Sequence, residues 1–176
     1  LSSVFLKPTL ARYKKQMKDT QEKCKFYTDL MIQNRDLIVK NVFKNKSDSV
    51  VNCPVAFSYI INNVIGQQNI NASSVTDLTP LEAFDMIEKC YSNLEKIRCA
   101  VPTALFKTLY FYYLSPKDLL FVKRFNKAAL TVLLENVAVN YKRAIVAPGE
   151  MVGMVAAQSI GEPTTQMSQP RNQTLK

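Results

Sequence analysis

The chain has 176 residues and a mass of 20.0 kDa, which suits one ordinary domain or at most two small ones. Apolar residues make up 47% of the chain, which excludes disordered and fibrous proteins. The chain has no histidine, which excludes Ser-His-Asp and Cys-His catalytic pairs and nearly every zinc site. The net charge is +9, and it is concentrated in residues 1–50, which contain 11 basic and 5 acidic side chains. This positive charge favours polyanionic or acidic partners.

The N-terminal residues predict a basic helix. Pro8 fits its first turn, because proline lacks the N–H that a first turn leaves unpaired anyway. We expect one break in this helix, near Thr20 or Thr28. Five apolar residues are expected to form its inward side: Tyr13, Met17, Phe26, Leu30 and Leu37.

A polar loop is predicted over residues 44–53. A short helix should begin at Pro54 and end at Gly66, since glycine is the usual residue at a helix C-terminus. Residues 67–79 are polar and rich in turn formers, so they are expected to link a basic helical region, 1–66, to a second helical region, 80–147.

The second region begins with the strongest helix start in the sequence. Thr79-Pro80-Leu81-Glu82 is a capping box with proline at the first helical position. The apolar residues that follow recur every three or four positions and end before Pro102: Leu81, Phe84, Ile87, Tyr91, Leu94 and Ile97.

Three further helices are expected. Residues 102–114 are apolar nearly all round, which predicts a buried helix, and Ser115-Pro116 repeats the capping pattern more weakly. Asn126 can cap a long helix that ends at about Val146. The fold class is therefore mainly α: an irregular helical segment with about six to eight helices.

Two groups of basic residues are candidates for binding nucleic acid, Lys14, Lys15 and Lys18 in one and Lys123, Arg124 and Lys127 in the other. Each phosphate that such residues neutralise releases counterions, which favours binding. The simpler reading is a solvated helix face, or a face that meets an acidic partner subunit. Phe121 and Phe125 flank the second group and, being four residues apart, are expected to pack in the core.

Residues 147–167 contain the most distinctive stretch of the chain. Pro148 and Glu150 favour a helix start, since a glutamate suits the positive end of the helix dipole. Gly153, Ala156 and Ala157 give this helix a side that another backbone can approach closely. Gly161 and Pro163 are expected to interrupt the helix, so the residues alone indicate a tight helix–helix contact followed by a bend.

These residues resemble the segment that leads into the trigger loop of the largest subunit of multisubunit DNA-directed RNA polymerases. The family pattern, PGE-x-VG-x-x-AAQSIGEP-x-TQM, is matched from Pro148 through Met167. Residues 54–63 are similar to the family's short Pro-Val helix after the foot region, and residues 104–146 resemble the helices that precede the trigger loop in the cleft region. About 130 residues align in outline.

The resemblance implies a fragment of the enzyme that joins nucleoside triphosphates on a DNA template, with no catalysis by the fragment alone. Gln166 matches a glutamine that approaches the nucleotide's ribose. The base of the trigger loop would be packed by Gly153, Ala156, Ala157, Gln158, Ser159, Gly161, Glu162 and Pro163. Other polymerase subunits, DNA template and RNA would be the partners, without a membrane.

The family's catalytic magnesium ions are held by an aspartate cluster elsewhere in the subunit, and this chain lacks that motif. The complete enzyme would contain Mg²⁺, but no cofactor is expected in this segment. An intracellular location is implied: the nucleus, or the cytoplasm or virion if the source is a large DNA virus rather than an AT-rich eukaryote.

The chain departs from the family after Met167. The family continues Thr-Leu-Asn-Thr-Phe-His, whereas residues 168–173 read Ser-Gln-Pro-Arg-Asn-Gln, and Pro170 would break a trigger helix. We therefore expect residues 168–176 to be an atypical tail. The competing hypothesis is a stand-alone basic helical module that binds nucleic acid or acts as a scaffold.

Overall fold

The structure, a computed structural model, describes residues 4–44, 52–97 and 100–168, with side chains as far as residue 162. The chain divides into two units, Leu1–Ala144 and Ile145–Lys176. The described ranges hold seven α-helices, one π-helix and no strand, so the predicted mainly α class with six to eight helices is confirmed. None of the described helices is long and apolar enough to cross a membrane.

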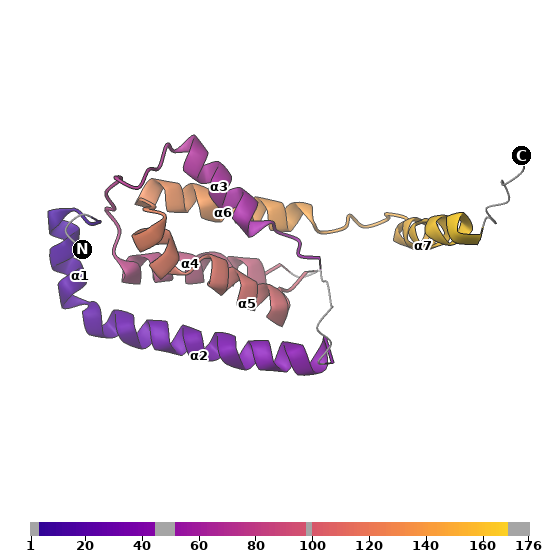
Figure 1. Cartoon of the computed structure of the whole chain (residues 1–176), viewed down its shortest axis with the longest axis horizontal. Coiled ribbons are helices and arrows are strands. Elements are labelled where there is room, and N and C mark those ends of the chain that lie inside the picture. The colour runs from indigo at the N-terminus through magenta and orange to yellow at the C-terminus, as the bar shows by residue number, and fades with distance from the viewer. Residues whose placement is uncertain (1–3, 45–51, 98–99, 169–176) are drawn as a thin grey trace, which may run out of the picture. The chain divides into compact units, whose positions relative to one another are not determined.

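The first unit contains six α-helices and the π-helix, and the second unit contains α7 (Figure 1). Their bounds are α1 Lys7–Lys15, α2 Met17–Asn41, α3 Phe57–Gln67, α4 Pro80–Glu95, α5 Ala104–Tyr113, η1 (the π-helix) Lys117–Val122, α6 Lys127–Arg143 and α7 Val152–Ser168.

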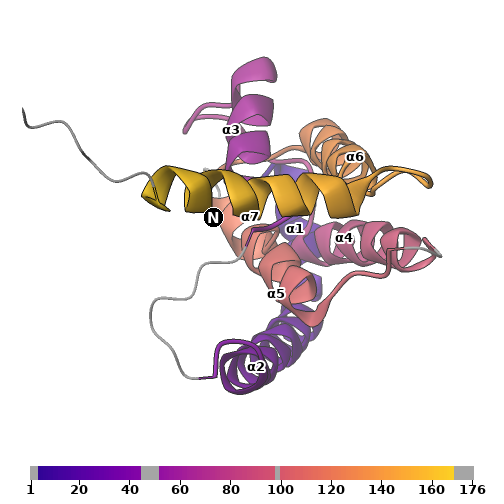
Figure 2. The ribbon, with the colours of Figure 1, turned by 90° about the vertical axis from the view of Figure 1, so that its right-hand side faces the viewer.

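The core of the first unit lies between three layers of helices. The long helix α2 runs beside α4 and α5, and α6 packs on the other side against α3 and α4 (Figures 1 and 2). The largest fully buried side chains come from α3, α4, α5, η1, α6 and the segments beside helices: Phe5, Ile61, Leu78, Ile87, Leu94, Tyr110, Leu114, Leu119, Leu120, Phe125, Leu130 and Leu133. This core is large enough to fix the positions of the surface residues discussed below.

The capping signals in the sequence locate two helix starts correctly. The Thr79 hydroxyl accepts from the Glu82 N–H at 3.3 Å, and the Glu82 carboxylate accepts from the Thr79 N–H at 3.2 Å, so the predicted capping box is confirmed. The Asn126 side chain accepts from the Ala129 N–H at 2.7 Å and starts α6, also as predicted. Both caps satisfy backbone donors that would otherwise lack a partner.

The break in the N-terminal helix lies at Gln16, so its predicted position near Thr20 or Thr28 was wrong. The Gln16 carbonyl accepts from the Thr20 N–H at 3.0 Å and from the Thr20 hydroxyl at 2.7 Å. A hydroxyl that shares a helix carbonyl in this way often bends a helix. The Thr28 hydroxyl makes the same bond to Cys24 at 2.8 Å, yet α2 continues past it.

The predicted inward side of the N-terminal helices was wrong for three of its five residues. The Tyr27 ring stacks on Phe84 of α4 and on Phe111 of α5, and this contact sets the side of α2 that faces the core. Phe26 comes one position earlier, about 100° away around the helix. It is 62% exposed as a result, and Leu37 is 56% exposed. Met17 is exposed as well, while Tyr13 and Leu30 are half-buried.

Helix α3 begins three residues after Pro54 and passes through Gly66, contrary to the prediction. The residue with a left-handed backbone is Asn69, at φ 48°. Asn69 donates to the Gly66 carbonyl at 3.3 Å, and the buried Ile70 donates back to Ile65 at 3.0 Å. This is a Schellman ending with asparagine in the place that glycine usually takes. The predicted loop over 44–53 lies largely outside the described residues.

The helix predicted to be buried all round has one exposed side. In α5 the side chains of Phe106, Tyr110 and Phe111 are buried, while Tyr112 is 64% exposed. Ser115-Pro116 does not start an α-helix, because the π-helix η1 follows and no side chain caps it. Phe125, at the end of this turn, is fully buried as predicted, and Phe121 is half-buried.

The segment 67–79 is tied to both ends of the first unit. Thr76 pairs with the N-terminal segment: its N–H donates to Val4 at 2.7 Å, and its carbonyl accepts from Leu6 at 3.1 Å. The Asp77 carboxylate accepts from the Lys127 N–H at 2.9 Å, at the positive end of α6. The segment therefore contacts residues on both sides of the proposed division; the domain boundaries stay a prediction.

Candidate functional site

The stretch that resembles the trigger-loop segment begins with a tight turn. The Glu150 N–H donates to the Ala147 carbonyl at 3.3 Å, and Gly149 has φ 89°. Proline at the second position and a left-handed glycine at the third are the requirements of a type II turn. A side chain at position 149 would meet no neighbour within 4 Å, so the backbone angle is what requires glycine here.

Two predictions about the following helix were wrong. Helix α7 begins at Val152, because Pro148 and Gly149 are used by the turn, so Glu150 precedes the helix instead of occupying its first turn. The helix also runs through Gly161 and Pro163 to Ser168. The φ angle of proline is compatible with a helix, and what Pro163 removes is the N–H that would have bonded to Ser159.

Helix α7 presents an unburied surface. All described side chains from Met151 to Glu162 are exposed, including five large apolar ones: Met151, Val152, Met154, Val155 and Ile160. Gly153 has open space where a side chain would lie, and its close contact with another backbone stays a prediction. The Ser159 hydroxyl donates to the Val155 carbonyl at 2.8 Å, while the side chains of Pro163 and Gln166 lie outside the described ones.

The predicted loop-base residues share this helix. Ala156, Ala157, Gln158, Gly161 and Glu162 lie with Gly153 and Ser159 on the first three turns of α7, and Gln166 follows about one turn after Glu162. The structure thus places the whole predicted set on one element of the second unit. Residues 169–176, which include most of the predicted tail, lie outside the described residues.

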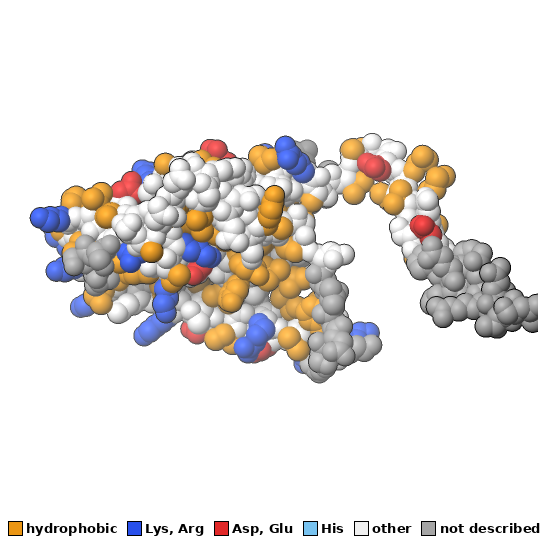
Figure 3. Space-filling view, turned by 45° about the horizontal axis from the view of Figure 1, so that its top comes forward, with side chains coloured by type: hydrophobic (Ala, Val, Ile, Leu, Met, Phe, Trp, Pro, Cys, Tyr) orange, Lys and Arg blue, Asp and Glu red, His pale blue; other side chains and the backbone are white. Residues whose placement is uncertain are grey.

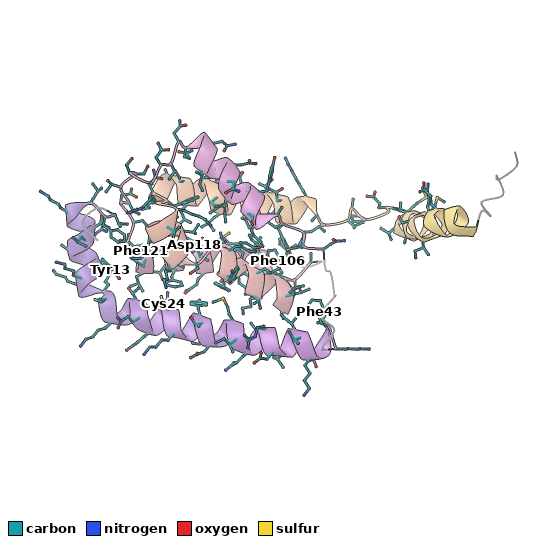
Figure 4. All side chains as sticks on the ribbon, in the orientation of Figure 1. Tyr13, Cys24, Phe43, Phe106, Asp118 and Phe121 are labelled. Carbon is teal, nitrogen blue, oxygen red and sulfur yellow. The ribbon has the colours of Figure 1, made fainter. Side chains whose placement is uncertain are left out.

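An aromatic contact in the first unit joins α1 to the turn beside the second group of basic residues. Tyr13 of α1 stacks on Phe5, with ring centroids 5.5 Å apart, and Phe121 of η1 meets both rings edge-on (Figure 4). This aromatic triad joins α1, which carries Lys14 and Lys15, to the turn that precedes Lys123. Figure 3 shows several Lys and Arg side chains at the end of the unit that α1 forms.

The individual basic residues differ in how far they are already paired. Lys123 forms an ion pair with Asp118. Arg124 has a left-handed backbone conformation, with φ 59°, and the next residue, Phe125, is buried in the core. Lys127 is exposed and uses its backbone N–H to bind Asp77. Lys14, Lys15 and Lys18 are exposed and make no ion pair with the part of the chain that the structure describes.

An ion pair that the sequence did not reveal also fixes this end of the unit. Arg12, one turn before Lys15, binds Glu82 at 2.7 Å. Glu82 is the capping-box residue of α4, so α1 is held against the start of that helix. The sequence alone does not distinguish Arg12 from the neighbouring lysines, because its ion pair depends on the contact between α1 and α4.

The described residues offer neither a metal site nor an activated nucleophile. No group of three or more His, Cys, Asp or Glu side chains within 4–44, 52–97 and 100–162 could hold a metal ion. The residues that the structure describes therefore do not fit the magnesium site that the resemblance implies for the complete enzyme. Burial raises the pKa of the Cys24 thiol, although Lys117 opposes this, and burial also raises the pKa of Cys90.

A family model described as RNA polymerase Rpb1, domain 5, matches residues 11–170, which is nearly the whole chain. The chain belongs to this family. The match includes all six basic candidates and the complete α7 helix of this Rpb1 domain 5 segment.

Two curated relatives extend this finding. The chain is 49% identical over 45 residues to the DNA-directed RNA polymerase subunit Rpo1C of Thermococcus gammatolerans, a match to 26% of this chain and 12% of the relative. It is 28% identical over 137 residues to the DNA-directed RNA polymerase II subunit RPB1-B of Trypanosoma brucei brucei, covering 67% of this chain and 8% of that subunit. The chain thus spans about a tenth of the length of these relatives.

Proposed function

We propose that this Rpb1 domain 5 segment contributes to DNA-templated RNA synthesis as part of a polymerase largest subunit. Its role is to support the trigger loop and to line the nucleic-acid channel, and it has no catalytic activity alone. The observation that carries the proposal is the match from Pro148 to Met167, which the structure forms as a turn followed by one exposed helix.

The exposed surface of α7 supports this role. A helix whose described side chains are all exposed, with four large apolar ones among them, needs a partner surface in the assembled enzyme. Gly153, Ala156 and Ala157 would let a neighbouring helix approach closely there. Helix α7 would then be a rigid base from which the loop after it opens and closes over the nucleotide.

Gln166 is the proposed substrate contact. Its amide can both donate to and accept from a ribose hydroxyl, and the helix that carries it starts at a defined turn. The nucleotide would be positioned rather than chemically activated by this residue. The two Mg²⁺ ions of the complete enzyme would be bound elsewhere in the subunit, and the location would be intracellular, in the nucleus or cytoplasm.

The experiment is to replace Gln166 in the full-length subunit and assemble the enzyme. Gln166→Ala should slow elongation by about tenfold and raise the KM for nucleoside triphosphates. Gln33→Ala, an exposed position on α2, is the matched control and should leave both unchanged. Elongation at the normal rate with the Gln166 variant would contradict the proposed contact.

A second candidate function is a nucleic-acid-binding module, favoured by the meeting of the two basic groups at the Phe5–Tyr13–Phe121 triad. Reversing the charges of Lys14, Lys15 and Lys18 should then weaken DNA or RNA binding and flatten its salt dependence by about three counterions. Binding that is unaffected by these changes would remove this candidate.

A further inference from the structure

A groove runs along α2 on the side that faces η1. Its widest part is a hollow of about 740 Å³ whose apolar lining includes Tyr13, Pro80, Phe121 and Val122. Val122 is 69% exposed, although it is a large aliphatic side chain on a short, well-anchored turn. Figure 4 shows Tyr13 and Phe121 at one end of this region and Cys24 of α2 below them.

Two smaller hollows continue the groove along α2. One, of about 90 Å³, shares Cys24 with the first, and another, of about 500 Å³, shares Met31 with the second. Lys117 lines all three. From Thr20 to Met31 the groove follows twelve residues of α2, roughly 16 Å or three helical turns. That length suits a short helix.

The charges around the widest part of the groove have one sign. Lys25 and Lys117 line it, no carboxylate does, and neither lysine pairs with an acid in the described chain. The neighbouring Lys23 is turned away toward Asp85 and Glu88. An occupant with carboxylates would thus meet two unpaired ammonium groups at the groove's edge.

We propose that this groove binds an acidic amphipathic helix of a partner protein. Apolar side chains at every third or fourth position of that helix would contact Phe121 and Val122, and its carboxylates would meet Lys25 and Lys117. Nucleic acid fits this groove less well, because bases stack on open aromatic faces, whereas the Tyr13 ring is stacked on Phe5 at 24°.

The test is selection of peptides from a displayed library of random 14-residue sequences against the full 176-residue chain, followed by fluorescence anisotropy with the enriched peptides. We expect enriched sequences in which acidic residues alternate with apolar ones at helical spacing. Val122→Asp should weaken their binding at least about tenfold, and Lys117→Glu about fivefold. The matched controls, Val139→Asp and Lys89→Glu, are exposed positions outside the groove and should change binding less than about twofold.

Both groove variants alter exposed side chains, so their circular dichroism should match that of the unchanged chain. The proposal is wrong if no acidic amphipathic sequence is enriched, or if the enriched peptides bind Val122→Asp as tightly as the unchanged chain. A poly-dT oligonucleotide that binds in the groove, with binding lost in both groove variants while the peptides fail to bind, would assign the groove to nucleic acid instead.

Discussion

The hydroxyl of Tyr27 donates a 2.7 Å hydrogen bond to the carboxylate of Glu88, 61 positions later in the chain. Lys23 binds the same carboxylate at 2.9 Å and Asp85 at 2.8 Å, while the Tyr27 ring stacks on Phe84 and Phe111. Helix α2 is thereby fastened to α4 and α5 by one aromatic and polar cluster. Tyr27 also lines the smallest of the three hollows of the groove along α2.

Removing the hydroxyl should loosen that attachment. Tyr27→Phe keeps the stacked ring but loses a hydrogen bond to a charged group, so the free energy of unfolding should fall by about 1–2 kcal/mol. Urea denaturation measures it. Tyr59→Phe, at an exposed position of α3, is the control and should change little. Equal effects of the two substitutions would show that the Glu88 bond contributes nothing.

The capping box at the start of α4 gives a second prediction. Thr79 is fully buried and bonds reciprocally with Glu82, so Thr79→Ala should destabilise the chain by about 1–2 kcal/mol. Thr79→Ser keeps the hydroxyl and should recover most of that loss. If serine and alanine at this position were equally destabilising in urea, the lost methyl group rather than the cap would account for the effect.

Stability should fall with rising pH in the alkaline range. Burial raises the pKa of Tyr91 to about 12, and burial together with the bond to Glu88 raises the pKa of Tyr27. Burial lowers the pKa of Lys23, but its bonds to Asp85 and Glu88 outweigh this and raise it. Each group holds its proton more tightly when folded, so the stability is complete below about pH 10 and is lost as the pH rises further.

The measurement is the urea midpoint from pH 7 to pH 12, with tyrosinate absorbance followed in parallel. The midpoint should fall above about pH 10, and Tyr27→Phe should make the fall shallower. A urea midpoint that stays constant through this range would contradict the conclusion that folding raises the pKa of Tyr27, Tyr91 and Lys23.

Replacing each of two glycines in or near α7 by alanine should affect amide hydrogen exchange differently. Gly153 lies in the helix with open space around it, so Gly153→Ala should favour the helix by about 1 kcal/mol and slow amide hydrogen exchange in α7 by about fivefold. Gly149 has φ 89°, where alanine is strained, so Gly149→Ala should give no such protection. Identical exchange rates in both variants would argue against the type II turn at this position.

The sequence predicted those features that depend on neighbouring residues. The capping box at Thr79 and the cap at Asn126 were found because their hydrogen bonds span only three residues. The stretch from Pro148 was recognised by its motif, although its turn was mistaken for a helix start, because Pro-Gly suits a type II turn as well as proline suits a first helical turn.

The features that were missed depend on distant contacts. Phe26 and Tyr27 are equally apolar neighbours, and only the positions of Phe84 and Phe111 decide which of them packs inward. Arg12 lies in the same basic stretch as Lys14 and Lys15, and its ion pair with Glu82 depends on the contact between α1 and α4. The aromatic triad that joins the two basic groups, and the groove along α2, likewise arise from segments about 100 residues apart.

The most direct test of the central claim is to measure the size of the native polypeptide that contains these residues and to identify the activity that co-purifies with it. An antibody against residues 9–25 should detect a protein far larger than 20.0 kDa that co-purifies with DNA-templated RNA synthesis. Depleting that protein with the antibody should remove the synthesis. A polypeptide of 20.0 kDa that separates from all polymerase activity would contradict the proposed role in RNA synthesis and leave the nucleic-acid-binding candidate in its place.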